Sequence, residues 1–327
     1  MKSKVFVRQK LIAALFLLLI SAAGAAAQAG WSFVQKDGAL DFVSVFFTSE
    51  ADGWIGGDGG YLAYTRDGGR SWTKQSLKTT ENINEVYFRN SESGYILAGP
   101  KIYISKDKGA TWRETRIFQL SELKGLTPEF LSVRFVDKRR GYIVGSVSNR
   151  SDEVVDSLVL QTVDGGESWH RIKVPTRMEL FHLDFVGDER GWIVGDKGSI
   201  IFTEDGGETW QKQASGTDRA LRGVDFRSSQ EGYVVGGRGV ILRTENGGRT
   251  WEKVTTPVTD SLFRVNFYDD KNGFIAGRNG VILRTDDKGK NWTKQESRTT
   301  EALYGLYIEK KYGWAVGGKG VILRYQR

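Results

Sequence analysis

One turn motif, Ser/Thr-x-Asp/Asn-x-Gly-x-x-Trp, is written six times along the chain. It reads "FTEDGGETWQKQ" at residues 202–213, "RTENGGRTWEKV" at 243–254 and "RTDDKGKNWTKQ" at 284–295. Its tryptophan recurs with spacings of 40, 57, 41, 41 and 41 residues, at Trp72, Trp112, Trp169, Trp210, Trp251 and Trp292. A constant period of this size indicates that one supersecondary unit is copied along the chain.

Two further markers show that there are seven units. A Gly-aromatic-aliphatic marker occurs as "GWIGG" at Gly53 and again at Gly94, Gly141, Gly191, Gly232, Gly273 and Gly313. A short apolar segment of the "LRGVDF" type precedes each of these copies. The third unit carries extra residues in two places, near "FQLSELKGLTPEF" and near "SNRSDEVVDS".

Each unit is predicted to form four short strands, which we name A to D in chain order. In the fifth unit they are the segments "LRGVDF", "GYVVG", "GVILRT" and "TWEKV", rich in β-branched and aromatic residues and bounded by Gly or Asp. Four strands in each repeat of about 40 residues are typical of a β-propeller. The apolar residues lack the i, i+3, i+4, i+7 spacing of helical repeats.

The two ends of the chain are predicted to complete one blade. The seventh unit has strands A, B and C, and then the sequence ends without strand D. The segment "GWSFVQ" at residues 30–35 resembles the strand D segments "SWTKQ" and "TWQKQ". The fold predicted is therefore all-β, a seven-bladed propeller of four-stranded blades over residues 30–327, with the last blade closed by the N-terminal strand.

Residues 1–29 differ from the rest in composition. A basic start with Lys2, Lys4, Arg8 and Lys10 is followed by the apolar run "LIAALFLLLI" and by small residues, a pattern typical of a signal peptide. An uncleaved anchor is the alternative. Removing these residues lowers the basic count from 47 to 43 against 40 acids, which gives no reason to expect nucleic acid binding. The chain has no Cys, so neither disulfides nor a thiolate metal site are expected.

The repeated motif is interpreted as structural, because a catalytic site would be unique whereas this motif serves equivalent turns. Its acid or amide is predicted to cap backbone N–H groups in the C-to-D turn, and its Trp to pack against a blade. These six turn residues are Asp67, Asp107, Asp164, Asp205, Asn246 and Asp287.

The turn motif resembles the Asp-box, or BNR repeat, of sialidases and related propellers. Together with the "GWxVG" strand B and the "GxILRT" strand C, it resembles the photosystem II stability and assembly factor family over nearly all of residues 30–327. This resemblance implies an exported, non-enzymatic scaffold on the lumenal side of a photosynthetic membrane, which helps new reaction-centre protein to assemble. The chain departs from cyanobacterial relatives in lacking a lipid-anchored Cys.

Enzyme signals are weak, and no catalytic residue, metal site or cofactor is predicted. His170 and His182 are the only histidines and are interpreted as structural. There is no Gly-x-Ser-x-Gly elbow with a partner and no phosphate-binding loop before a helix. The alternative function is a sialidase-like glycoside hydrolase or a glycan-binding propeller, since arginines and carboxylates are plentiful. Its weakness is the regularity of the repeats, because a catalytic cleft normally requires long, irregular loops.

Cations recur near the B-to-C turns, which lie on one face of a propeller together with the D-to-A connections. They are Lys101, Arg150, Lys197, Arg238, Arg278 and Lys319, with Asp58 as the exception in the first unit. Ordinary solvated turn charge is one reading. The other is a basic face that binds an acidic protein partner, such as a membrane protein complex or its assembly intermediate. The sequence thus predicts a monomeric scaffold exported to a periplasm, a thylakoid lumen or the outside of the cell.

Overall fold

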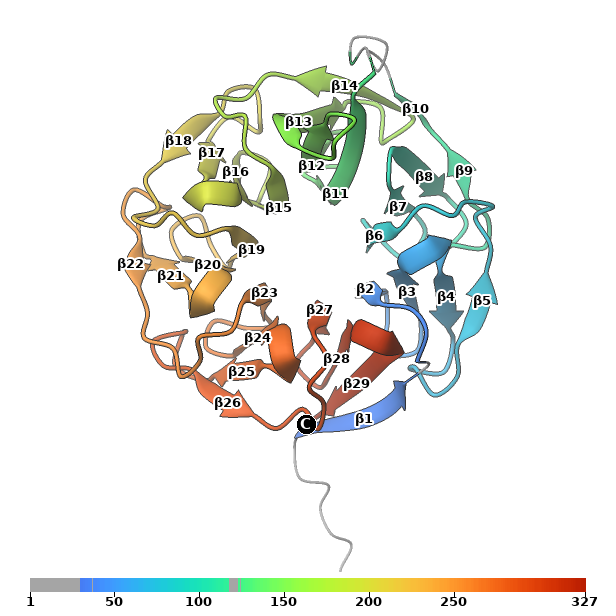
Figure 1. Ribbon diagram of the computed structural model, residues 1–327, viewed down its shortest axis with the longest axis vertical. Helices are drawn as coiled ribbons and strands as arrows, with labels where there is room; N and C mark the ends of the chain where they lie inside the picture. The colour runs from blue at the N-terminus through green and yellow to red at the C-terminus, as the bar shows by residue number, and fades with distance from the viewer. Residues whose placement is uncertain (1–29, 37, 118–122, 124) are drawn as a thin grey trace, which may run out of the picture.

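The computed structural model describes residues 30–327 except 37, 118–122 and 124; the predicted signal peptide lies outside this part of the chain. Seven β-sheets stand around a central axis like the blades of a propeller (Figure 1). The sequence prediction of a seven-bladed propeller is confirmed. Strand A of each blade lies nearest the axis and strand D lies at the rim.

The strands follow the predicted A-to-D order. The first three blades are β2 (Phe42–Phe47), β3 (Gly53–Gly57), β4 (Leu62–Thr65) and β5 (Thr73–Gln75); β6 (Ile83–Phe88), β7 (Gly94–Ala98), β8 (Lys101–Ser105) and β9 (Arg113–Glu114); β11 (Thr127–Phe135), β12 (Gly141–Ser148), β13 (Val154–Thr162) and β14 (Ser168–Ile172). The next three are β15 (Leu180–Val186), β16 (Arg190–Gly195), β17 (Ile200–Thr203) and β18 (Gln211–Gln213); β19 (Leu221–Phe226), β20 (Gly232–Gly236), β21 (Ile241–Thr244) and β22 (Glu252–Lys253); β23 (Leu262–Phe267), β24 (Gly273–Gly277), β25 (Ile282–Thr285) and β26 (Thr293–Gln295).

The seventh blade closes the ring as predicted. It contains β27 (Leu303–Ile308), β28 (Tyr312–Gly317), β29 (Val321–Gln326) and the N-terminal β1 (Gly30–Lys36). Strand β1 pairs antiparallel with β29, from Gly30 opposite Gln326 to Lys36 opposite Val321. Figure 1 shows β1 and β29 side by side, although they come from opposite ends of the chain. Trp31 is buried against the rings of Phe274 and Tyr325.

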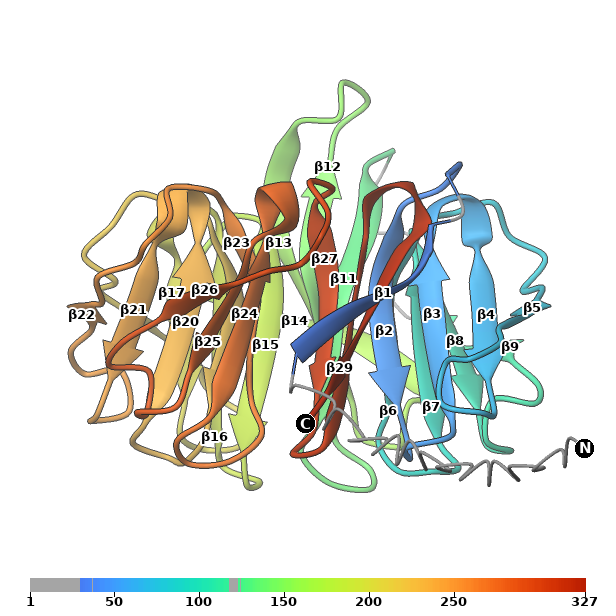
Figure 2. The ribbon, with the colours of Figure 1, turned by 90° about the horizontal axis from the view of Figure 1, so that it is seen from below.

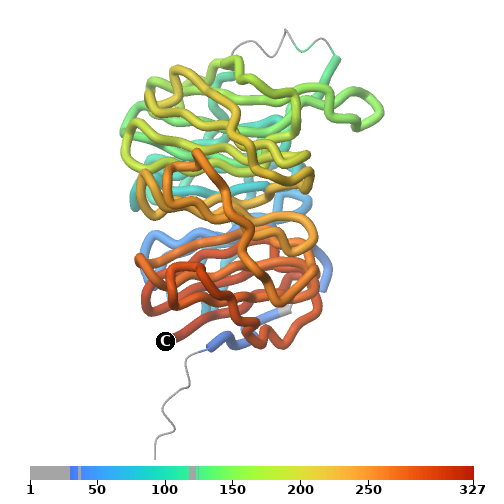
Figure 3. The backbone as a smooth tube through the Cα atoms, turned by 90° about the vertical axis from the view of Figure 1, so that its left-hand side faces the viewer, coloured from blue at the N-terminus to red at the C-terminus, as the bar shows by residue number. Residues whose placement is uncertain are grey.

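The third blade breaks the repeat. Its strands β12 and β13 are longer than their counterparts, and their hairpin extends beyond the other blades on one face (Figures 2 and 3). This extension is the second of the two insertions predicted from the sequence. The first lies partly outside the described residues; it includes β10 (Arg116–Ile117), which pairs parallel with β14 at the rim.

Aromatic rings join each blade to the next. At six of the seven junctions, a ring from strand B packs on a Phe at the end of strand A of the following blade, as Trp192 does on Phe226 and Trp314 on Phe47. The Trp of the turn motif meets the same Phe edge-on, so Trp251 contacts Phe226 with its plane turned by 88°. In the seventh blade strand A ends in Ile308, and Phe274 packs on Trp31 and Tyr325 instead. Burial of such large rings dominates the energetics of a core. The contact of Trp314 with Phe47 joins the last blade to the first.

Candidate functional site

The Asp-box turns show why the motif is repeated. In the fourth blade, the Asp205 carboxylate accepts hydrogen bonds from the Thr209 amide at 2.9 Å and from the hydroxyls of Thr203 and Thr209. The hydroxyl of Thr203 accepts the amide of Gly207 at 2.9 Å. The same contacts recur around Asp67, Asp107 and Asp164, and around Asp287 the Asn291 side-chain amide takes the place of the second hydroxyl. In the fifth blade Asn246 takes the place of the aspartate. Its side-chain oxygen accepts the Thr250 amide, and its side-chain nitrogen donates to the Thr250 hydroxyl at 2.8 Å.

The same turns also hold the neighbouring blade. Tyr142 from strand B of the third blade donates its hydroxyl to the Gly206 carbonyl at 2.6 Å. Gly207 has φ of +95°, and a Cβ at this residue would lie 2.3 Å from the Tyr142 ring. Glycine is therefore required both by the backbone angle and by the close ring. Each such turn caps its own hairpin and receives the ring of the preceding blade.

We expect Asp205→Ala to lower the free energy of unfolding by about 1–2 kcal/mol, because it removes three hydrogen bonds from the turn. Asp205→Asn should lower the free energy of unfolding much less, since Asn246 makes the equivalent turn in the next blade. Burial opposes ionisation, but hydrogen bonds from Thr209 lower the pKa of Asp205 to about 2. The stabilisation is therefore present above about pH 4 and is lost toward pH 2. Urea unfolding at pH 7 measures the free energy of unfolding of both variants. If Asp205→Asn lowers it as much as Asp205→Ala does, an amide cannot replace the carboxylate in this turn, which would contradict the prediction.

The six cations predicted from the B-to-C turns lie on one face, which also carries the short 3₁₀ turns η1 (Asp58–Gly60), η3 (Asp196–Gly198), η4 (Gly237–Gly239), η5 (Arg278–Gly280) and η6 (Gly318–Gly320). Lys197, Arg238 and Lys319 occupy one equivalent position, with φ between +50° and +54°. Glycine or asparagine suits this angle better than a long cationic side chain, and Gly59 and Asn279 stand there in two other blades. We call this surface the B–C face.

The other three cations are placed differently. Lys101 opens strand β8 and is half-buried, with Glu114 3.9 Å away. Arg150 is exposed at the tip of the long hairpin of the third blade, and Arg278 is exposed one residue before Asn279. Carboxylates also occupy this face, among them Asp41, Asp58, Glu81, Asp196, Asp218 and Glu301. Lys319 is bound to Glu301 at 3.0 Å. The charge of the whole face is therefore mixed.

Positive charge is concentrated at one place at the junction of the third and fourth blades. Two adjoining cavities of about 770 and 500 Å³ lie there and share Thr176, Arg177 and Lys212; we name them together the blade 3–4 groove. Its lining contains five cations and one acid: Arg171, Lys173, Arg177, Lys197, Lys212 and Asp156. The groove has the size of a ligand site and is strongly cationic.

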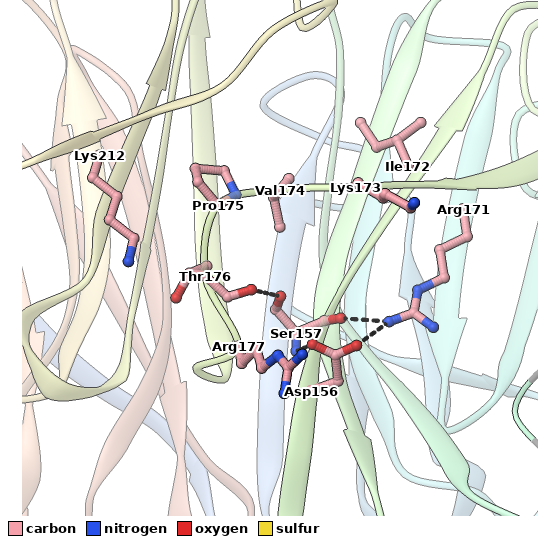
Figure 4. Close-up of a pocket in the computed structure, with 10 residues that line it drawn as sticks. All are labelled: Asp156, Ser157, Arg171, Ile172, Lys173, Val174, Pro175, Thr176, Arg177 and Lys212. Carbon is pink, nitrogen blue, oxygen red and sulfur yellow. Dashed lines mark hydrogen bonds and ion pairs between the residues drawn. The ribbon is translucent and has the colours of Figure 1, made fainter.

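The geometry of the groove leaves most of its cations available. Figure 4 shows Lys212 on one side of the larger cavity and Arg171 on the other, with the connection 173–177 between them. Arg171 is bound to Asp156 at 2.6 Å and to the Ser157 carbonyl at 3.1 Å. The remaining cations, Lys173, Arg177, Lys197 and Lys212, are exposed and make no salt bridge with another described residue.

The prediction from the B-to-C turns included Lys197 but missed Lys173 and Lys212. Lys212 lies in strand D of the fourth blade, and Lys173 directly follows strand D of the third blade. Lysine also occurs in strand D of other units, as in the "TKQ" segments, so the sequence did not mark these two as special. Only the structure brings Lys173 and Lys212, which come from neighbouring blades, to one groove.

The central channel is the second polar site. Side chains of the inner strands accept amide hydrogen bonds from the next blade, as Asp184 does from Phe226 at 2.7 Å and Asp225 from Phe267 at 3.2 Å. His182 accepts the amide of Val224 through Nδ1 at 3.3 Å. Burial, together with nearby arginine charge, holds the pKa of His182 well below its usual range. These contacts bind the blades to one another.

The described residues contain no group of three His, Cys, Asp or Glu side chains that could hold a metal ion. The channel cavity has a volume of about 200 Å³, smaller than typical ligand sites of about 300–1,000 Å³. Within the same part of the chain, no helix has the length and apolar character needed to span a membrane.

Comparison with known proteins gives relatives of one kind. A Photosystem II assembly lipoprotein Ycf48 from Synechococcus sp. (strain CC9902) is 26% identical over 151 residues, which are 44% of this chain and 40% of the relative. The Photosystem II stability/assembly factor HCF136, chloroplastic, from Arabidopsis thaliana is 32% identical over 89 residues, 25% of this chain and 22% of the relative. The matched stretches thus span less than half the length of these curated relatives.

Solved structures share the fold. YCF48 from Cyanidioschyzon merolae has a TM-score of 0.71 at 18% identity, over 91% of this chain and 99% of that chain. A structure of YCF48 bound to D1 peptide has a TM-score of 0.72 at 19% identity, over 91% and 95%. A virginiamycin B lyase from Staphylococcus aureus reaches 0.73 at 8% identity, over 91% and 99%, so the architecture alone also serves enzymes.

The family model described as Photosynthesis system II assembly factor YCF48 matches the chain in five overlapping stretches, residues 23–125, 116–212, 166–259, 209–300 and 259–326. These matches follow the repeat of the blades and cover the whole propeller. The chain therefore belongs to the family of the photosystem II assembly factor YCF48.

Proposed function

We propose that the protein is an exported, non-enzymatic propeller that holds an acidic segment of a protein partner in the blade 3–4 groove while a membrane protein complex is assembled. Photosystem II is the complex that the family points to. The single observation that carries the proposal is the concentration of five cations against one acid in this groove. Elsewhere on the B–C face, cations and carboxylates are mixed, as in the pair of Lys319 and Glu301.

The relatives supply the class of partner. A neighbour of the same fold was solved as YCF48 bound to D1 peptide, and both curated relatives are named as photosystem II assembly factors. A scaffold of this kind needs a rigid surface and an accessible charged site, and the ring of packed blades provides both. An arginine or lysine groove binds carboxylates through charge-assisted hydrogen bonds, and it attracts them over a distance set by the ionic strength.

A non-enzymatic role is supported by the use that the channel makes of its carboxylates. Asp184 and Asp225 accept backbone amides of the neighbouring blades, so these acids join strands. The glycan alternative needs either a pair of free carboxylates across a sugar or an arginine cluster with a Tyr nucleophile. Failure of the protein to hydrolyse a chromogenic sialoside and a chromogenic xyloglucan oligosaccharide is the expected result.

The test of the groove is a charge reversal. We expect the triple variant Lys173→Glu, Arg177→Glu and Lys212→Glu to weaken binding of D1 peptides about tenfold or more. Three cations that attract an acidic segment would be replaced by carboxylates that repel it. All three residues are exposed, so each substitution should cost less than about 0.5 kcal/mol of stability. Fluorescence anisotropy with overlapping labelled D1 peptides at low and high salt measures the change, and wild-type binding should weaken as salt rises.

Two control variants make the result specific. Arg238→Glu, Arg278→Glu and Lys319→Glu reverse the B–C face outside the groove, which tests the broader hypothesis drawn from the sequence. Lys138→Glu, Lys271→Glu and Lys311→Glu reverse exposed cations on the opposite face, in the A-to-B turns. Equal binding by the groove variant and by the opposite-face variant contradicts the proposal. A loss confined to the Arg238 variant moves the site from the groove to the rest of the B–C face.

A further inference from the structure

The mouth of the central channel on the B–C face is a separate site, built differently from the groove. One residue from strand A of each blade surrounds it: Val43, Asn84, Leu131, Phe181, Arg222, Phe263 and Tyr304. These residues enclose a cavity of about 180 Å³, to which Arg264 also contributes. Five of the seven ring positions are apolar or aromatic. All seven side chains are half-buried, so the mouth is an open but largely apolar cup.

Two arginines belong to this cup, Arg222 as one of its seven ring positions and Arg264 below the ring. Arg264 lines both the mouth and the channel below it, and its Nη1 donates only to backbone carbonyls, of Phe263 at 3.1 Å and of Arg222 at 3.4 Å. Neither Arg264 nor Arg222 forms a salt bridge with another described residue. The Arg222 guanidinium lies over the Phe181 ring, 4.7 Å from its centre. A guanidinium that is removed from water and lacks an anion is costly to the fold.

The Glu85 carboxylate, which lines the channel cavity with Arg264, is already occupied. Glu85 binds Arg134 at 2.9 Å through one oxygen and the Val133 amide at 2.5 Å through the other. Asp184 and Asp225 also line the channel cavity, and each accepts a backbone amide from the next blade. The charge of Arg222 acts on Glu179, but the two side chains form no salt bridge. Burial lowers the pKa of Arg264, and the charges of Arg134 and Arg222 act in the same direction, although Glu85 opposes them. Arg222 and Arg264 thus have no direct carboxylate contact with another described residue under this apolar rim.

We propose that the channel mouth binds a carboxylate carried on an aromatic or apolar body, with the carboxylate on Arg222 and Arg264 and the apolar part between Phe181, Phe263 and Tyr304. Such a ligand supplies the anion that the arginines lack. The ring centres of Phe263 and Tyr304 lie 5.5 Å apart, so a ligand ring can pack against both side chains. The carboxylate can belong to a small organic acid or to the C-terminal residue of a peptide, because both present the same chemistry. The proposal does not depend on the blade 3–4 groove.

Benzoate is the first probe, and benzamide is its uncharged counterpart. We expect benzoate to raise the melting temperature and to shift the NMR signals of residues in the mouth, whereas benzamide at the same concentration and ionic strength does neither. Acetate should bind more weakly than benzoate, since it lacks the apolar part. N-acetylphenylalanine and its amide form the second pair. If N-acetylphenylalanine binds as tightly as benzoate or more tightly, and its amide does not bind, the mouth is assigned to peptide C-termini. If N-acetylphenylalanine binds much more weakly than benzoate, the mouth is assigned to small acids.

Variants identify the residues. Arg264→Gln should weaken benzoate binding about tenfold or more and, without ligand, raise the melting temperature, because an unneutralised cation leaves the channel. Arg222→Gln, which changes a more accessible residue, should weaken binding in the same direction and keeps the test valid if Arg264→Gln folds poorly. Arg238→Gln, on the same face outside the mouth, should bind like the wild type. Equal responses to benzoate and benzamide, or unchanged benzoate binding in both mouth variants, would overturn the proposal.

Discussion

Removing residues 30–36 should destabilise the propeller by about 5 kcal/mol or more. Strand β1 pairs with β29 along its length, and its loss removes a row of backbone hydrogen bonds worth roughly 1 kcal/mol each. Trp31 leaves with it, and loss of a buried Trp side chain costs about 3–5 kcal/mol. Against a total stability of roughly 5–15 kcal/mol, such a loss leaves little or no folded protein at 37 °C.

The measurement is thermal and urea unfolding of the chain that begins at residue 30 compared with the chain that begins at residue 37. A synthetic peptide with the sequence of residues 30–36 should restore part of the lost stability when it is added to the shorter chain, because it can pair with the exposed edge of β29. A peptide of the same composition in scrambled order is the control. If the two chains melt within a degree or two of each other, β1 contributes little to closure.

The repeat made most of the fold predictable. The period of Trp72 and its five copies indicated the repeat, the seven Gly-aromatic-aliphatic markers gave the blade number, and the segment at residues 30–35 predicted the closure. The N-terminal strand was predictable in kind, but the details of its side chains were not. Trp31 is buried, whereas Phe33 of the same strand is 42% exposed. It lies at the rim, where strand D has no further blade strand to cover it, and the pairing with β29 shifts register just after it.

The site was only partly predictable. The sequence indicated cations near the B-to-C turns, yet it could not show that carboxylates such as Asp196 and Glu301 share the same face. Lys173 and Lys212 belong to different blades, and no spacing rule in the sequence brings them together. The same holds for the channel, where Arg134, Asp184 and Arg264 meet only because the ring is closed. One signal was present: the position of Asp184 in strand A is also polar in the next two units, as Asp225 and Asn266.

This recurring polar position creates a second large effect, a dependence of stability on pH that originates inside the channel. Burial raises the pKa of Asp184 to about 6, although the Phe226 amide and Arg134 favour its charged form. Burial and the charge of Asp184 together raise the pKa of Asp225 to about 7. In the unfolded chain, both carboxyls would titrate near pH 4. The folded protein thus binds protons that the unfolded chain releases.

The sign of the effect follows from linkage. When the pKa of a carboxyl is higher in the folded state, the free energy of unfolding falls as pH rises from the unfolded pKa to the folded pKa. For Asp184 and Asp225 this range runs from about pH 4 to about pH 7. Asp-box residues such as Asp205 act in the opposite sense, but only below about pH 4. Between pH 5 and pH 8, the channel pair should therefore dominate the part of the pH dependence that comes from these aspartates.

Asp184→Asn should raise the free energy of unfolding by about 1–2 kcal/mol at pH 8 and change it little at pH 4.5, where the wild-type carboxyl is already protonated. The amide oxygen can still accept the Phe226 amide, so the contact between blades persists. Urea unfolding across this pH range measures the change, and Asp270→Asn, at an exposed turn residue, controls for the loss of one negative charge. Carboxyl NMR of the variant should show a lower pKa for Asp225, because the charge of Asp184 no longer opposes its ionisation. A stabilisation of equal size at both pH values would contradict the linkage, and an unchanged Asp225 titration would show that the two carboxyls do not interact.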